Sequence, residues 1–152
     1  MRLPAARHVA IALLGILACR DTTGPSASQV EQYRAQWLEH QIHDYAYQYL
    51  STGFFNSLSG QSIRVTVRAD TVRAATFVAS GDTVPTGLAV LPTIAQLFDG
   101  AEAAAANGTL KAMRLDPTLT YPTELEFSGP PDASGTLRIS HFQVLPWQAA
   151  TR

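Results

Sequence analysis

The stretch from Glu39 to Tyr49, EHQIHDYAYQY, decides how this chain is organised, because its periodicity changes there from helical to strand-like. Upstream of it, apolar residues recur at the spacing of a helix with one face in the core: Val30, Tyr33, Trp37 and Leu38. Tyr45, Tyr47 and Tyr49 then alternate with other residues, as in a strand. The stretch therefore predicts a helix that ends near residues 40–42 and a strand that begins at residue 44.

The same stretch contains His40 and His43, each next to a carboxylate, and so raises the alternative of a metal site. A zinc-protease helix needs histidines four positions apart, with glutamate directly after the first. Here the spacing is three and Glu39 comes first. His40, His43 and Asp44 could share a metal only if the helix continued through them, and the tyrosine alternation predicts that it does not. We expect no metal site, since a histidine near a helix C-terminus is explained by the helix dipole.

Further elements follow from the same two periodicities. The first helix is expected to be capped by Ser28 with Glu31, and the second by Thr93 with Gln96. Asn107 and Gly108 should stop the second helix. Strands are predicted at 62–68, 71–79, 110–115, 123–127 and 137–147, with a bulge in the last near Ser140 or His141 and a surface loop at 80–92. The predicted fold is α+β, with two helices packed on one face of a mostly antiparallel sheet of about six strands, in the order α-β-β-β-α-β-β-β.

The N-terminus predicts export. Arg2 and Arg7 precede an apolar run from Val9 to Ala18, which at about ten residues is too short to span a bilayer and suits a secretory signal. Residues 16–19, ILAC, resemble the bacterial lipobox, in which the cysteine is lipidated and becomes the first mature residue. Cys19 is the only cysteine in the chain. We therefore expect a lipoprotein held to the membrane through Cys19, on the outer membrane facing the periplasm because Arg20 replaces the aspartate that commonly retains lipoproteins at the inner membrane.

Length and charge limit the remaining possibilities. A chain of 152 residues suffices for one domain. We divide it into a signal peptide (1–18), a lipidated cysteine and flexible tether (19–27), a single α+β domain (28–148) and a tail (149–152). Loss of Arg2 and Arg7 with the signal changes the formal net charge from −1 to −3. Nucleic acid is not an expected partner, because its recognition asks for a clustered basic face.

Candidate binding residues are aromatic. Tyr45, Tyr47 and Tyr49 share one strand face, and Phe54 and Phe55 follow in a loop. Tyrosine and phenylalanine are enriched where proteins meet partners. The tyrosines could instead form the core under the helices, and the sequence leaves both interpretations open.

The sequence gives weaker evidence for catalytic residues than for binding residues. A hydrolase could pair His141 with a serine and an aspartate, but the chain has no GxSxG motif to expose a serine nucleophile. Glu124 and Glu126 share a strand face, yet the apolar Leu125 and Phe127 around them suggest the wet side of a sheet. The sequence shows no phosphate loop and no cofactor fingerprint, and we expect no cofactor.

Several of these motifs together resemble a known bacterial family of secreted proteins and lipoproteins, domain of unknown function family 6174. The resemblance rests on Trp37 and on the blocks DYAYQY (44–49), VTVRADTV (65–72), TIAQLFD (93–99) and DPTLTYPTELEF (116–127). It implies the fold and export, and no activity. Relatives often carry two cysteines after the tyrosine strand, where this chain has residues 51–57 without cysteine, so no disulfide is expected there. Relatives also tend to have glycine where this chain has Thr120, which argues against a tight glycine turn.

The sequence thus favours a membrane-anchored envelope lipoprotein whose domain binds a protein or small-molecule partner without catalysis. The alternative is an envelope enzyme of hydrolase type that uses His40, His43, Asp44 or His141. An enzyme requires these groups to converge on one cleft.

Overall fold

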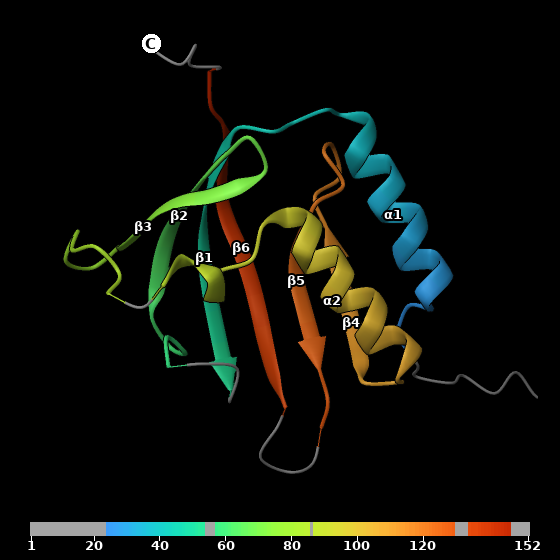
Figure 1. Ribbon diagram of the computed structural model, residues 1–152. Helices are drawn as coiled ribbons and strands as arrows, with labels where there is room; N and C mark the ends of the chain where they lie inside the picture. Colours follow the sequence, from blue (N-terminus) through green and yellow to red (C-terminus); the bar gives the residue numbers. More distant parts are fainter. Residues whose placement is uncertain (1–23, 54–56, 86, 130–133, 147–152) are drawn as a thin grey trace, which may run out of the picture.

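The computed structural model describes residues 24–53, 57–85, 87–129 and 134–146, and Figure 1 shows their arrangement. The elements follow in the order α1 (Ala27–Glu39), β1 (Tyr45–Gly53), β2 (Ser62–Arg68), β3 (Thr71–Phe77), a short 3₁₀ helix η1 (Leu88–Val90), α2 (Ile94–Ala106), β4 (Leu110–Leu115), β5 (Pro122–Phe127) and β6 (Gly135–Val144). The described residues contain no helix that is both long enough and apolar enough to cross a bilayer.

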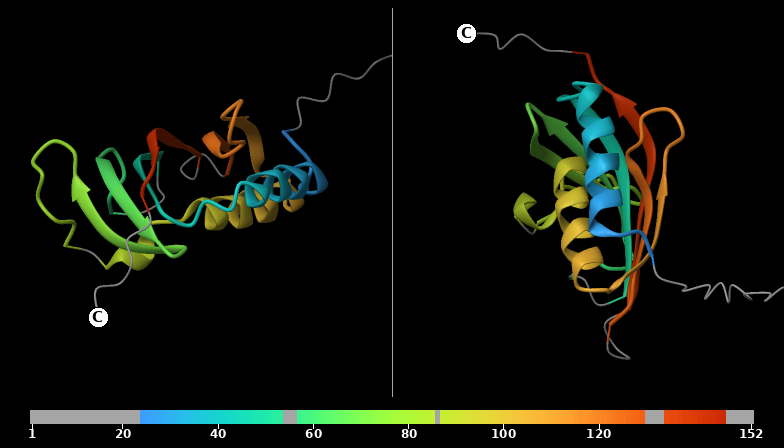
Figure 2. Two further views of the ribbon diagram at one scale, coloured as in Figure 1. Left: turned by 90° about the horizontal axis from the view of Figure 1, so that it is seen from above. Right: turned by 90° about the vertical axis from the view of Figure 1, so that its right-hand side faces the viewer.

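The six strands form one antiparallel sheet with the spatial order β3-β2-β1-β6-β5-β4. The predicted α+β class, strand number and element order are confirmed. Each half of the chain supplies a helix followed by a three-stranded meander, and the two meanders join in the middle of the sheet through β1 and β6. In the further views the two helices lie side by side on the same side of the sheet (Figure 2).

The core lies between the helices and this sheet face. Trp37 of α1 and Phe98 of α2 are buried, and β2 contributes Ile63, Val65 and Val67. An aromatic cluster fills the region where α1 crosses the sheet, with Trp37 edge-on to Tyr45 at 5.9 Å between ring centroids. Tyr121 stacks on Phe142 at 4.4 Å. Rings that meet edge-to-face or offset contribute about 0.5–1.5 kcal/mol per pair beyond the area they bury, so this cluster adds to the stability of the core.

Several boundaries differ from the prediction. Ser26, not Ser28, caps α1, and the capping box is completed by Gln29 instead of Glu31. Two serine motifs overlap here, and the chain uses the earlier one: Ser26 has the extended backbone of an N-cap, with φ −72° and ψ 160°, and the helix begins at Ala27. β3 ends at Phe77 and not at 79, since the chain turns back at Gly81 and Thr83 pairs with Thr76.

At the other end of the chain β5 begins one residue early, at Pro122, and β6 covers Gly135–Val144 instead of 137–147. β6 begins earlier because Gly135 pairs with Gly53. The capping of α2 by Thr93 and Gln96 is as predicted, and Gly108 has the left-handed φ of +70° expected after that helix.

The predicted bulge in β6 is present. Ala46 pairs with Gln143 and Gln48 pairs with Ser140, so His141 and Phe142 together face Tyr47. His141 has a φ of +50°. The bulge explains the shift in apolar phase along this strand, because the extra residue returns Phe142 to the core side.

Thr120 also occupies the left-handed region, with a φ of +59°. A tight turn therefore forms here with threonine in the place where relatives tend to carry glycine. It is held by Asp116, whose Oδ1 accepts the N–H groups of Thr118 and Leu119 at 2.9 and 2.8 Å. The carboxylate offsets the strain of a β-branched residue in this conformation.

Candidate functional site

The tyrosine strand belongs to the core. Tyr45, Tyr47 and Tyr49 are 2%, 0% and 3% exposed, so their ring faces are not available to a partner. Of the two interpretations of these residues, the structure places the rings between the sheet and the helices. Phe54 and Phe55, the other candidates for partner binding, lie outside the described residues.

Two of the tyrosine hydroxyls hold the start of α2. The Tyr45 oxygen accepts the backbone N–H of Ile94, the first residue of that helix, at 2.9 Å. The Tyr47 hydroxyl donates to the carbonyl of Pro92. Burial is the main cause that raises the pKa of Tyr45 to about 12, and the Asp70 charge adds to it, while the bonds to Ile94 and Thr93 act in the opposite direction. Burial likewise raises the pKa of Tyr47. Both phenols are therefore neutral structural groups at physiological pH.

The histidine motif braces the β2–β3 hairpin. Nδ1 of His43 lies 2.7 Å from Oδ2 of Asp70, and the His43 carbonyl accepts the Asp70 N–H at 3.1 Å. Asp44 Oδ1 accepts the N–H of Ala69 at 2.9 Å, and its other oxygen lies 3.5 Å from Arg68. Ala69 and Asp70 both have positive φ, as the two central residues of a type I′ turn require. Since neither is glycine, His43 and Asp44 supply the contacts that hold this turn.

Three of the four candidate enzyme residues, His40, His43 and Asp44, line one pocket of about 310 Å³, whereas His141 is not among its lining residues. His40 ends α1, and its backbone N–H bonds to Trp37. His43 and Asp44 are used by the hairpin, and the His141 ring lies 3.2 Å from its neighbour Ser140. Across the described ranges, no three His, Cys, Asp or Glu side chains are grouped as a metal would require.

The two glutamates of β5, Glu124 and Glu126, have different surroundings. Glu124 accepts from Arg138 of the neighbouring β6 at 3.0 Å, whereas Glu126 is exposed. Leu125 between them is 1% exposed. The two carboxylates thus lie on the sheet face away from the core, and one of them belongs to a cross-strand ion pair.

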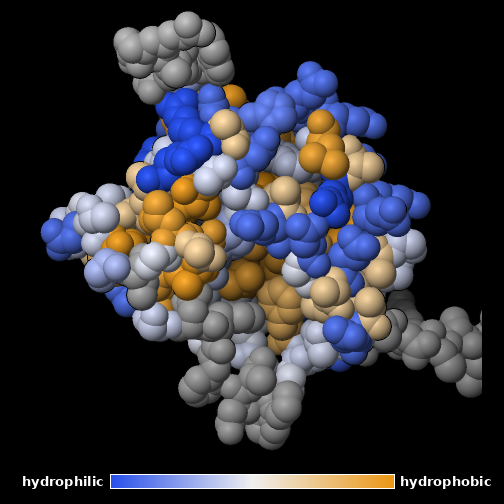
Figure 3. All heavy atoms as spheres, in the orientation of Figure 1, coloured by the Kyte–Doolittle hydropathy of each residue, from blue (hydrophilic) through white to orange (hydrophobic). Residues whose placement is uncertain are grey.

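A groove runs between the start of β3, η1 and the start of α2, and we call it the hairpin groove. Its volume is about 400 Å³, and it is lined by Asp70, Thr71, Val72, Leu88, Ala89, Leu91, Thr93 and Gln96. Hydrophobic side chains gather on the surface over β3 and η1 (Figure 3). Thr93 and Gln96 already bond to each other's backbone in the α2 cap. Among the lining residues Asp70 alone is charged, and its side chain is 60% exposed.

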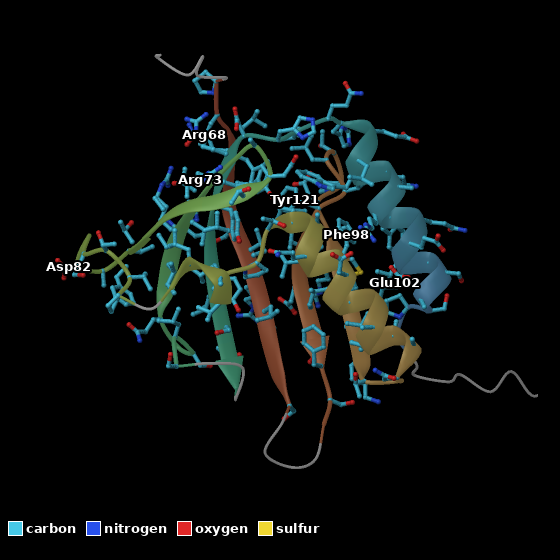
Figure 4. The ribbon with its side chains drawn as sticks, in the orientation of Figure 1. Arg68, Arg73, Asp82, Phe98, Glu102 and Tyr121 are labelled. Carbon is cyan, nitrogen blue, oxygen red and sulfur yellow. The ribbon has the colours of Figure 1, made fainter. Side chains whose placement is uncertain are left out.

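Cations flank the same hairpin. Arg68 and Arg73 both lie towards the β2–β3 turn, while Asp82 lies in the loop beyond the other end of β3 (Figure 4). Arg68 is engaged, because its guanidinium donates to the carbonyl of Pro146 at 2.7 Å and lies beside Asp44. Among the described residues, the Asp70 carboxylate at the groove rim forms its ion pair with the exposed His43.

The groove was not anticipated from the sequence, which predicted residues 80–92 as a surface loop. Val84 and Leu91 are in fact buried, and η1 packs beside β3. The available signal was the apolar run Leu88–Leu91 inside a proline-bearing segment.

Comparison with known proteins gives one match. The model of a family of unknown function, DUF6174, covers residues 29–144, which include both helices nearly in full and all six strands. Neither a curated protein nor a solved structure matches the chain.

Proposed function

The chain belongs to the DUF6174 family of unknown function, and from that premise we propose that it is a lipid-anchored module of the bacterial cell envelope that binds a partner and does no catalysis. Anchoring would be through Cys19, and the domain would face the periplasm from the outer membrane. The observation that supports binding over catalysis is that His43 and Asp44, the polar groups of the histidine motif, hold the β2–β3 turn. His43, Asp44 and Glu124 each serve a structural contact, and the hairpin groove offers an apolar concavity for a ligand.

The hairpin groove favours a particular chemistry. Val72, Leu88, Ala89 and Leu91 offer apolar walls, and Asp70 offers one carboxylate at the rim. Apolar burial supplies affinity and a single charged group supplies orientation, as in many ligand sites. The matching ligand is a peptide segment of a partner protein that inserts an apolar side chain and brings a lysine or arginine to Asp70.

The alternative, a hydrolase, requires a nucleophile and a base within hydrogen-bond reach of each other and of a cleft. His141 contacts Ser140, but both side chains are exposed on β6. Neither of them lines the hairpin groove. This arrangement argues against catalysis by His141.

Attachment is tested with Cys19→Ser in intact cells. Lipidation needs the thiol, so the variant should move from the membrane fraction to the soluble periplasmic fraction, and acyl mass should disappear from the N-terminal peptide. A membrane fraction unchanged by the substitution would refute the anchor.

Partner binding is tested with a photoreactive amino acid placed at Ala89 in the groove. Leu38 provides the matched control, because it is an apolar residue of α1 that is 55% exposed and does not line the groove. We expect a crosslinked product in cells from position 89 and none from position 38. The same product should weaken in an Asp70→Asn background, where the charge is lost but asparagine tolerates the left-handed φ of +57°. Equal products at 89 and 38, or a product indifferent to Asp70→Asn, would contradict the proposed ligand chemistry.

A further inference from the structure

One edge of the sheet is half covered by the chain itself. β3 stands at the end of the strand order, next to β2 (Figure 1). Residues 82–84 run antiparallel to its second half, with Thr83 opposite Thr76. The Val84 N–H donates to the Ala75 carbonyl at 3.0 Å. Residues 82–84 thus lie where a seventh strand would continue the sheet.

The first half of β3 is open. In the described part of the chain, residues 71–74 form no backbone hydrogen bond outside the ladder with β2. Thr71 pairs with Arg68 across the two-residue turn, so its N–H and C=O point towards β2. Because these groups alternate in direction along a strand, those of Val72 point outwards. The bulge at Arg73 follows, so Val72 is the centre of a short open edge.

The hairpin groove adjoins this open edge. Val72 lies opposite Val67, which is 0% exposed in the core, so both side chains are on the helix side of the sheet. The groove extends from Val72 to Leu88 and Leu91. In an added antiparallel strand, the residue opposite Val72 sends its side chain to this same face and so into the groove. Two positions later, a side chain on the same face lies opposite Asp70.

From this register we propose that the hairpin groove binds an extended segment of a partner protein as a short antiparallel strand added to the open half of β3. The inference rests on the proposed function and specifies its ligand. The ligand backbone bonds to Val72, its apolar side chain enters the groove, and a lysine or arginine two residues later meets Asp70. Unpaired backbone groups select an extended chain, because a helix satisfies its own N–H and C=O groups. The Asp70 carboxylate in the lining selects the cation.

The symmetric alternative, a dimer through β3, lacks this chemistry. If Val72 lies opposite its counterpart in an antiparallel pair, Ala74 of the second copy lies opposite Asp70 and brings no cation. If Arg73 of the second copy lies opposite Asp70, Thr71 lies opposite Val72 and brings no apolar side chain for the groove. We therefore assign the edge to a different protein.

The test uses the full-length protein in detergent micelles and a fluorescein-labelled synthetic peptide, Thr-Leu-Thr-Lys-Thr, whose leucine and lysine have the proposed spacing. Two control peptides change one feature each. N-methylation of the leucine removes its N–H and keeps its side chain, whereas glutamate in place of lysine reverses the charge. Fluorescence anisotropy measures affinity. Amide hydrogen exchange, followed by mass spectrometry with unlabelled peptide, measures protection of β3.

We expect the parent peptide to slow exchange in residues 71–75 several-fold and to bind about ten-fold more tightly than the N-methylated peptide. The glutamate peptide should bind several-fold more weakly, as should the parent peptide with the Asp70→Asn protein. Asp82→Asn is the matched control and should leave affinity unchanged, because Asp82 is exposed in the loop beyond the other end of β3 (Figure 4).

Equal affinities for the parent and N-methylated peptides, or exchange in β3 unchanged by bound parent peptide, would overturn strand addition and leave the groove as a peptide site. Affinity indifferent to both charge changes would overturn the role of Asp70. Failure of all three peptides to bind at millimolar concentration would overturn this inference, whereas crosslinking at Ala89 judges the proposed function separately. A dimer in sedimentation that protects residues 71–75 without peptide would assign the edge to a second copy and overturn it too.

Discussion

Replacing Tyr45 by phenylalanine isolates one hydrogen bond at the start of α2. The ring is 2% exposed and packs against Trp37, and the substitution keeps it. Only the hydroxyl is lost, and with it the acceptor for the Ile94 N–H at 2.9 Å. Ile94 is 0% exposed, so water cannot replace the acceptor without a rearrangement. A buried donor left without a partner costs about 1–3 kcal/mol. We therefore expect the free energy of unfolding to fall by about 2 kcal/mol.

For a domain of this size, that loss lowers the melting temperature by about 6–10 °C. The assay is thermal and urea unfolding of the chain from residue 20 onward, followed by circular dichroism. Tyr33→Phe is the matched control, because Tyr33 is a partly buried tyrosine of α1 for which the described contacts give no hydroxyl hydrogen bond. Its melting temperature should change by about 2 °C or less. A Tyr45→Phe protein as stable as Tyr33→Phe would refute the claim that this hydroxyl caps α2.

Three further results are expected. Stability should fall between about pH 10 and pH 12, because the unfolded chain loses the Tyr45 and Tyr47 protons near pH 10 while burial keeps both pKa values higher in the folded state. Each phenol contributes a slope of about 1.4 kcal/mol per pH unit, which urea unfolding at several pH values measures. A chelator should leave the melting temperature unchanged. Trp37→Ala should lower the free energy of unfolding by about 3–5 kcal/mol, and His43→Ala, whose ion pair is exposed, by less than about 1 kcal/mol. Comparable losses would show that the histidine motif does more than hold the hairpin. Thr120→Gly should raise the free energy of unfolding by about 0.5–1 kcal/mol, since relief of the left-handed strain exceeds the entropy cost of glycine, and a decrease would mean that the threonine contacts outweigh the strain.

The local elements were predictable because their signals are short-range. The alternation of Tyr45, Tyr47 and Tyr49 fixed β1, and the pair Thr93 and Gln96 fixed the start of α2. The start of α1 was misplaced by two residues because two serine motifs compete within four positions, and periodicity does not rank them. The change of apolar phase in β6 was sufficient to locate its bulge.

The candidate site was less predictable because it depends on pairing between distant segments. His43 and Asp44 were recognised as notable, but their partners Asp70 and Ala69 are more than twenty positions away and meet them only through the pairing of β1 with β2. The hairpin groove likewise needs η1 beside β3, and no pattern in residues 80–92 indicates that neighbour. The left-handed conformations of Ala69, Asp70 and Thr120 were also missed, since none of these residues is glycine.

The pairing of β1 with β6 has a consequence for the order in which the molecule folds. These two strands lie in the middle of the sheet, yet Tyr45 meets Val144 and Gly53 meets Gly135, so the central ladder joins the first strand of the chain to the last. Contacts between such distant segments form slowly, because a long loop must close before they are made. During synthesis β1 must wait for nearly the whole chain before it gains its second neighbour. A nascent chain stopped before residue 135 has a β1 with one open edge, and the domain reaches its native state only after its last strand has been made.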